Sequence, residues 1–232
     1  MKKLIVISCI IYTSLGFAQF GIFNKNPLIN MENFQKQRVH WGYFLGFNTY
    51  DFKFDYLQDI GEVKVASSFG FNVGLVGNLR INDYFDLRFE PGLYYTERDL
   101  EFPNFSNLSQ ANREARSTYL HFPLLLKYSA LRTGNVKPYL VGGFSTATNL
   151  ASNSKAIDDN LNNRFRVNQW TYHYEIGFGV DIFTEHFIFS PSIRGVFGIG
   201  NELIPDNDLN SPWTSNISSM RSRGLLINFT FH

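Results

Sequence analysis

The chain has 232 residues, with 21 Lys and Arg against 20 Asp and Glu, and it contains a single cysteine. Beyond the N-terminus it has no run of about 20 apolar residues, which excludes a spanning helix in the mature chain. Aromatic residues make up 17% of the chain, a high share.

The first 18 residues have the pattern of a secretory signal peptide. Lys2 and Lys3 precede an apolar run from residue 4 to residue 15, and small residues at Gly16 and Ala18 predict cleavage before Gln19. A lipoprotein signal at Cys9 is disfavoured because the apolar stretch before it is too short. The mature chain then has no cysteine, and its 19 cationic and 20 acidic residues give a net charge of −1, which argues against a nucleic-acid partner.

From residue 41 onward, apolar and polar residues alternate, in segments separated by connections that are alternately long and short. Between Phe69 and Ile81, apolar side chains take nearly every second place, and the two-residue turn Asn82-Asp83 follows. A period of two is typical of strands with one apolar and one polar face. Such strands escape hydropathy scans because half of each strand faces inward. This alternation predicts an all-β fold, an antiparallel transmembrane β-barrel of the outer membrane.

Eight strands are predicted, an even number as expected for a bacterial single-chain barrel. They span residues 41–54, 68–81, 84–97, 117–129, 137–148, 169–182, 187–199 and 222–232. Short connections alternate with long ones, and we expect the short turns and both termini to face the periplasm. No Pro- or Ser-rich linker interrupts the series, so residues 41–232 form one barrel domain, preceded by a periplasmic leader at residues 19–40.

The sixth strand predicts which side chains face the lipid. Trp170, Phe178 and the other apolar residues of the same phase should point outward, and Thr171, His173 and Glu175 inward. The last strand directs its apolar residues outward in the same way, and its aromatic residue next to the C-terminus resembles the end signal of outer-membrane proteins.

The first strand is ambiguous, because its apolar residues change phase. Tyr43 and Phe47 occupy one phase, whereas Tyr50 and Phe52 occupy the other. We expect a β-bulge near Asn48 or Thr49 to reconcile the two halves.

Charged and polar side chains collect on the inward faces. A hydrolase hypothesis would pair His121 or His173 with Glu175, so that a histidine activates a nucleophile. The competing interpretation is structural filling, because an eight-stranded lumen is just wide enough for side chains and the charges nearly cancel. No serine has an evident triad spacing, so we favour filling, expect neither an enzyme nor an open pore, and predict no catalytic residue. The predicted inward-facing set is Asp86, Arg88, Glu90, His121, Lys127, His173, Glu175, Asp181 and Arg194.

Two segments outside the strands remain open to more than one interpretation. Residues 206–210 begin like a calcium loop, but Ser211 replaces the glycine and Ile217 the glutamate that such a loop requires, so we expect a solvated loop with no metal or cofactor. The leader, residues 19–40, should hang in the periplasm, either as a flexible lead into the first strand or as a site where a partner binds its aromatic residues.

The stretch from Asn33 to Asn48 resembles the opening of the PorT (also SprT) proteins of the Bacteroidetes. Two further stretches, Tyr119 to Tyr128 and Lys137 to Gly143, resemble paired strands of the wider barrel family to which PorT belongs, so the likeness covers essentially the whole mature chain. It implies an outer-membrane component of the type IX secretion system, which exports proteins with C-terminal signals and supports motility in gliding species. It also implies no catalytic residues.

The sequence therefore predicts an outer-membrane barrel that acts in type IX secretion through contacts with other components of that system in the outer membrane or periplasm. Apart from the lipid bilayer no other partner is expected, neither a nucleic acid nor a small-molecule substrate. The alternative is a small barrel of the OmpX or OmpA type that uses its long loops as a surface binding or adhesion module. A lipid-modifying enzyme is a third, more distant hypothesis.

Overall fold

A computed structural model describes residues 29–232 apart from residues 60, 104, 106 and 116. The predicted signal peptide, its cleavage site and the leader up to residue 28 therefore lie outside the described residues. Within the described part of the chain, none of the helices has both the length and the apolar character needed to cross a membrane.

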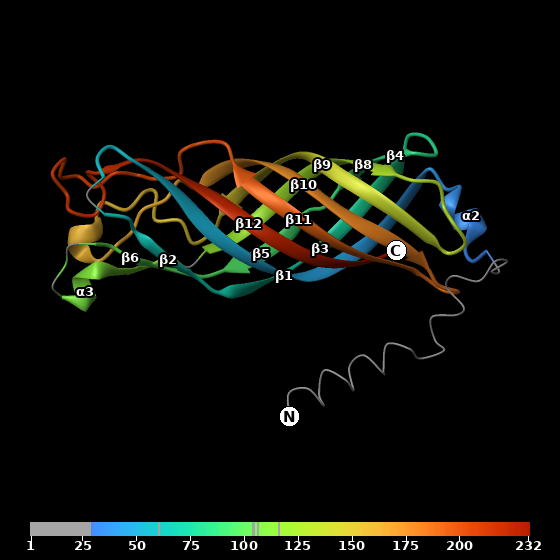
Figure 1. Ribbon diagram of the computed structural model, residues 1–232, viewed down its shortest axis with the longest axis horizontal. Helices are drawn as coiled ribbons and strands as arrows, with labels where there is room; N and C mark the ends of the chain where they lie inside the picture. The colour runs from blue at the N-terminus through green and yellow to red at the C-terminus, as the bar shows by residue number, and fades with distance from the viewer. Residues whose placement is uncertain (1–28, 60, 104, 106, 116) are drawn as a thin grey trace, which may run out of the picture.

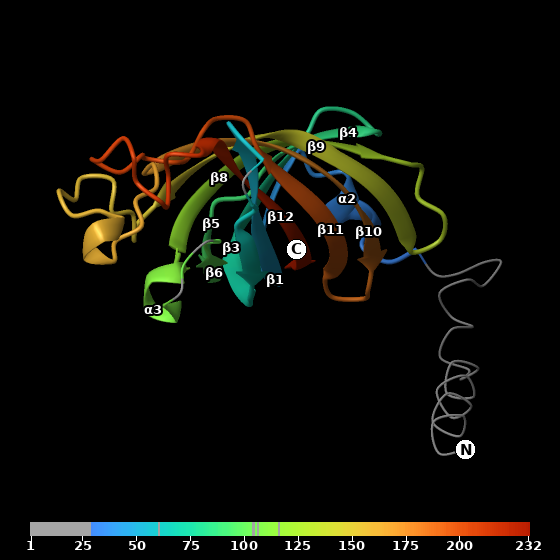
Figure 2. The same ribbon diagram turned by 60° about the vertical axis from the view of Figure 1, so that its left-hand side comes forward.

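Eight antiparallel wall strands close into a ring (Figures 1 and 2). The spatial order is β1, β12, β11, β10, β9, β8, then β4 with β5, then β3, which pairs with β1 again. The predicted fold class is confirmed. The wall strands, of which β4 and β5 are two segments that share one place in the ring, are β1 (Val39–Tyr56), β3 (Phe69–Arg80), β4 (Phe85–Phe89), β5 (Gly92–Thr96), β8 (Ser117–Ser129), β9 (Val136–Asn149), β10 (Trp170–Phe183), β11 (Ile188–Gly198) and β12 (Ile217–Phe231).

The third predicted strand is split into β4 and β5 at Glu90 and Pro91. Proline has no N–H to donate to a neighbouring strand, so it interrupts the ladder. Two backbone bonds bridge the gap: Glu90 N–H donates to the Pro123 carbonyl over 3.2 Å, and Leu75 N–H donates to the Pro91 carbonyl over 2.9 Å. The wall therefore remains closed across the interruption.

The predicted side-chain phase of the sixth strand holds on β10. Phe178 is 56% exposed and Trp170 is also exposed, whereas His173 and Glu175 are buried. Aromatic rings on this outward face stack across neighbouring strands, as Tyr174 does on Phe197 with ring centroids 5.1 Å apart. The barrel thus presents an apolar, aromatic-rich surface to lipid.

The bulge predicted near Asn48 or Thr49 is wrong. The register of β1 with β12 runs unbroken from Tyr43 to Asp55, and the shift comes only between Asp55 and Tyr56. The apolar residues change face because their surroundings change along a regular strand: Phe47 is exposed on the outer face, whereas Phe52 is buried on the inner face. The polar outer residues beyond Thr49 therefore lie past the apolar band.

The long connections form a folded structure at the end of the barrel away from the C-terminus (Figure 1). We expect this end to face the outside, and we call the structure the extracellular cap. A three-stranded sheet of β2 (Lys64–Ser67), β6 (Arg98–Glu101) and β7 (Asn112–Glu114) continues the direction of β3, β5 and β8, and the short helix α3 (Leu108–Ala111) precedes β7. All four long connections contribute to one apolar cluster, together with the ends of β1 and β12 nearest the cap. Its buried members are Phe52, Val63, Leu100, Phe102, Phe165, Leu203, Trp213, Ile217 and Met220.

The opposite end of the barrel, which we expect to face the periplasm and call the periplasmic end, carries the described part of the leader. It forms the short helix α2 (Glu32–Gln35) beside the short connections, near the C-terminus (Figure 1). The backbone N–H of Asn30 donates to the Asn135 side chain over 3.0 Å, and its side-chain amide donates to the Phe183 carbonyl over 3.2 Å. Of the two interpretations of the leader, these contacts disfavour a flexible lead for the segment around Asn30.

Candidate functional site: the filled lumen and its two ends

All nine side chains that the sequence predicts for the interior are buried. They come from β4, the break that follows it at Glu90, β8, β10 and β11, because the strands send alternate side chains into the same narrow space. Three charged residues that the sequence analysis did not place inside are buried with them: Arg98, Lys137 and Glu202. The twelve together include five carboxylates and five Lys or Arg side chains.

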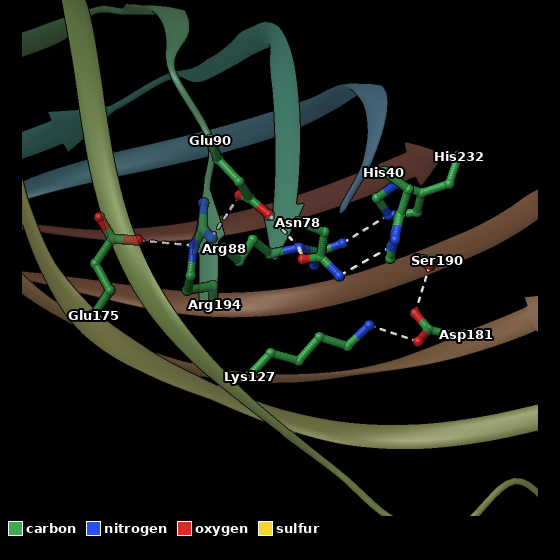
Figure 3. Close-up of polar contacts among 10 residues, drawn as sticks. All are labelled: His40, Asn78, Arg88, Glu90, Lys127, Glu175, Asp181, Ser190, Arg194 and His232. Atoms are coloured by element: carbon green, nitrogen blue, oxygen red, sulfur yellow. Dashed lines mark hydrogen bonds and ion pairs between the residues drawn. The ribbon is translucent and has the colours of Figure 1, made fainter. Parts of the chain in front are cut away.

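The centre of the lumen is an ion-pair cluster built on Arg194 of β11 (Figure 3). Its Nη1 lies 2.7 Å from Oε2 of Glu90, and its Nε lies 2.8 Å from Oε2 of Glu175. Arg88 approaches the other oxygen of Glu90 with an Nε to Oε1 distance of 3.3 Å. Buried charges are tolerated where each has a partner of opposite sign, so this cluster ties the strand of β4 to β10 and β11 across the lumen.

Towards the periplasmic end, the same network reaches the last residue of the chain. Arg88 Nε donates to Asn78 over 3.2 Å, and its Nη2 lies 2.8 Å from Nε2 of His232. Beside it, Lys127 Nζ lies 2.5 Å from Asp181 Oδ2, and the hydroxyl of Ser190 donates to Oδ1 of the same carboxylate over 2.6 Å (Figure 3).

Towards the extracellular end, Arg98 fills the lumen under the cap. Its guanidinium lies 3.8 Å from the centroid of the Phe52 ring and donates to the hydroxyls of Tyr119 and Ser222 over 2.9 and 3.2 Å. Ser222 in turn donates through its hydroxyl to Glu202 over 2.7 Å. Arg98 was not predicted to face inward, because it lies in a long connection just after the alternating segment, where no periodicity marks its direction.

The two histidines of the hydrolase hypothesis meet inside the lumen, with His121 and His173 ring centroids 5.6 Å apart. The structure also brings Ser145, which the sequence analysis did not single out, to 2.9 Å from Nε2 of His121. Oε1 of Glu175 lies 3.2 Å from that same nitrogen. A relay would need the carboxylate on one ring nitrogen and the serine on the other, so this arrangement differs from a catalytic triad.

Residues 206–210, the segment that begins like a calcium loop, form part of the cap. Asp206 is buried and accepts the side-chain amide of Asn160 over 3.0 Å and the hydroxyl of Ser211. Asn160 also accepts from Arg113 Nε over 3.1 Å. The expectation of a solvated loop is therefore wrong at Asp206. Within the described ranges no group of three or more His, Cys, Asp or Glu side chains is placed to hold a metal ion.

The leader is held at the periplasmic end by contacts with the short connection between β8 and β9. Arg132 donates through Nη2 to the carbonyl of Asn30 and to the side chain of Asn135, each over 2.7 Å, and its guanidinium lies 3.8 Å from the Phe183 ring centroid. Further along the leader, the Phe34 ring lies 5.3 Å from the His40 ring. We call this set of contacts the leader dock.

A comparison with protein families agrees with this architecture. Residues 17–203, more than half of the chain, match the family model of the outer membrane protein beta-barrel domain. Among solved structures, the chain is similar to OprG from Pseudomonas aeruginosa, at 17% identity over 85% of this chain and 97% of that chain, with a TM-score of 0.49.

Two other solved structures are more weakly similar. Neisserial surface protein A shares 17% identity over 84% of this chain and 98% of its own, with a TM-score of 0.39. AlkL, solved by solid-state NMR in lipid bilayers, shares 13% identity over 89% and 92%, with a TM-score of 0.43. No curated protein matches the chain.

Proposed function

The chain belongs to the outer membrane protein β-barrel domain family and lies in the cell outer membrane, and from this premise we propose that it is a component of the type IX secretion system. The resemblance of residues 33–48 to the opening of PorT proteins supports this proposal. In this role the protein acts through contacts with other components of that system, and not as an enzyme or a binder of small molecules or nucleic acids.

The filled lumen is the observation that supports action through surfaces. Glu90, Glu175 and Arg194 are each at most 4% exposed and hold one another in the middle of the barrel. A space filled in this way leaves no passage for a folded cargo, so the working surface has to be on the outside of the barrel. The leader dock supports a periplasmic surface, because it fixes the leader beside the short turns.

Two deletions test this proposal. Loss of the gene should retain type IX cargo inside the cell. Deletion of residues 20–35 should leave a folded barrel in the outer membrane that no longer supports secretion. The matched control is deletion of residues 208–210, an exposed tip of the extracellular cap, which should secrete normally. Normal secretion without the leader, together with loss of export when the tip is removed, would contradict the assignment of the working face.

The extracellular cap favours a second candidate function, a surface binding or adhesion module. Its four connections share a buried core, with Trp213 donating through Nε1 to the Gln110 carbonyl over 2.9 Å, so they present a fixed surface. Intact secretion in a gene deletion strain, combined with lost adhesion to surfaces or host molecules, would favour this alternative over type IX secretion.

A further inference from the structure

The outer face of β1 and β12 changes abruptly from apolar to charged at one height. On β1 the outward residues from Trp41 to Phe47 are exposed and apolar, whereas those beyond Thr49 are Asp51, Lys53 and Asp55. The stretch from residue 41 to residue 49 is nine residues long, about the length that a tilted strand needs to cross the hydrocarbon core. The charged outward residues therefore begin where the membrane interior ends, at the height of the lipid headgroups.

The register places these charges in three successive rows. Asp51 lies opposite Arg223, Lys53 lies opposite Arg221, and Asp55 lies opposite Ser219. The two rows with an arginine therefore put Lys53, Arg221 and Arg223 beside one another on two neighbouring strands. A direct cross-strand pair of like charges, such as Lys53 and Arg221, is unfavourable unless an anion lies between them.

Asp51 and Asp55 accept hydrogen bonds from only some of the donors on these cations. Arg223 uses Nε and Nη2 on one oxygen of Asp51, over 2.9 and 2.6 Å. Arg221 uses Nη2 on Asp55, and its side chain is still 36% exposed. Lys53 is exposed and takes part in none of the ion pairs found there. The patch therefore retains donors that a further anion would satisfy.

The rest of the rim at this height has a different character. The outer face of the three-stranded cap sheet carries Asp99, Glu101 and Glu114 with one lysine, Lys64. On β10 and β11 the outward side chains at this end, such as Trp170 and Phe197, are uncharged. Among these strands, the exposed cations at this height therefore gather on β1 and β12.

We propose that the face formed by Lys53, Arg221 and Arg223 binds the phosphorylated headgroup of an outer-leaflet lipid. Arginine donors in a planar fork fit phosphate oxygens, and a lysine adds a mobile point charge. The bilayer places headgroups at this height all round the barrel, and the acidic flank repels the same phosphates. The lipid is therefore held at the β1 and β12 flank and orients the barrel relative to its surroundings. Asp51 and Asp55 keep the arginines extended in the absence of lipid.

The test compares three probes on purified full-length mature protein by native mass spectrometry. The probes are phosphorylated lipid A, the same lipid without phosphates, and inorganic phosphate as a competitor. Wild type should retain the phosphorylated lipid in preference to the dephosphorylated form, more strongly at low salt. The double variant Lys53→Gln with Arg221→Gln should lose about five-fold in affinity for each cation removed. The matched control Lys64→Gln, at the acidic flank, should bind as wild type does.

Equal retention of both lipids, or an equal loss in Lys64→Gln, would overturn the proposal. Displacement of the lipid by inorganic phosphate at similar concentration would show that the site takes free phosphate instead of a headgroup, which would overturn the choice of ligand. A heat-induced mobility shift on gels, measured for each variant, confirms that the barrel has formed before binding is compared.

Discussion

At the scale of single residues, the lumen charges were largely predictable from strand phase alone. Asp181 and Arg194 were assigned to the interior because each alternates with apolar neighbours, and both are buried. Their partners were not predictable, since ion pairs such as Arg194 with Glu90 join residues that are 104 positions apart. Pairings of this kind depend on the order of strands around the ring, which periodicity within one strand does not contain.

Glu175 provides the first prediction at this scale. Replacement by leucine removes the carboxylate that lies 2.8 Å from Arg194 and leaves that buried cation with Glu90 alone. Since breaking a buried pair costs about 3 to 5 kcal/mol, we expect a loss of this size in the free energy of unfolding. Urea unfolding of the refolded barrel in detergent measures it. Glu185→Leu, an exposed position in a short turn, is the control, and equal stability of the two variants would refute the role of Glu175.

Asp159 provides a pH-dependent prediction in the cap. The backbone N–H of Asn207 donates to its carboxylate over 3.0 Å and holds the pKa of this group below its ordinary value of 3.8. A depressed pKa in the folded state means that the contact stabilises the cap above the ordinary pKa and is lost as the pH falls through the lower, folded-state pKa. We expect hydrogen exchange at residues 157–164 and 206–208 to increase on acidification below about pH 4.

The matched variant for this prediction is Asp159→Asn, which keeps an acceptor oxygen but does not titrate. Its cap should exchange faster than that of wild type at neutral pH, and its exchange should depend less on acidification. An unchanged dependence on pH in Asp159→Asn would assign the acid response to other groups.

At the scale of elements, strands with one apolar face were predictable, and a strand whose surroundings change along its length was not. The alternation on β10 gave the correct phase throughout. On β1 the change from Phe47 outside to Tyr50 and Phe52 inside suggested a bulge, because apolar residues were assumed to face lipid everywhere. Beyond the bilayer the apolar environment is the core of the cap, so the inner face becomes the apolar one.

The lipid face of β10 gives a prediction of assembly. Phe178→Arg places a cation in the apolar band, at a cost of about 2 to 4 kcal/mol near the bilayer midplane, so the folded barrel should be much less abundant in the outer membrane. The measurement is the heat-modifiable fraction on gels. Phe178→Leu is the control; a change at Gly177 is unsuitable, because a Cβ there would lie 2.4 Å from the Ile193 carbonyl oxygen. Normal assembly of Phe178→Arg would show that this position does not face lipid.

The leader dock gives a prediction for the element at the periplasmic end. Arg132→Ala removes the bonds to Asn30 and Asn135, so backbone amides at residues 30–37 should exchange faster with solvent while the heat-modifiable barrel is retained. Arg38→Ala, an exposed position within the leader, should leave this exchange unchanged. Unaltered exchange in Arg132→Ala would mean that the turn does not hold the leader.

At the scale of the whole molecule, the number of strands, their antiparallel order and the end at which the long connections lie were all contained in the sequence. The cap was not, because Val63, Phe165 and Trp213 come from three connections that lack periodicity, and their contacts depend on closure of the ring. Asp206 shows the same limit: its polar neighbours in sequence suggested solvent, whereas its bonds to Asn160 and Ser211 come from the folded cap.

The lumen of the barrel is filled, and we propose that the protein works through its surfaces. The buried cluster of Glu90, Glu175 and Arg194 blocks the lumen, and charges held in this way offer no path for ions. The most direct test is the single-channel current of the full mature protein in planar bilayers, with insertion verified by the heat-modifiable band of the same preparation. We predict no steady current at any applied voltage that the bilayer withstands; a steady, reproducible single-channel conductance would contradict the account.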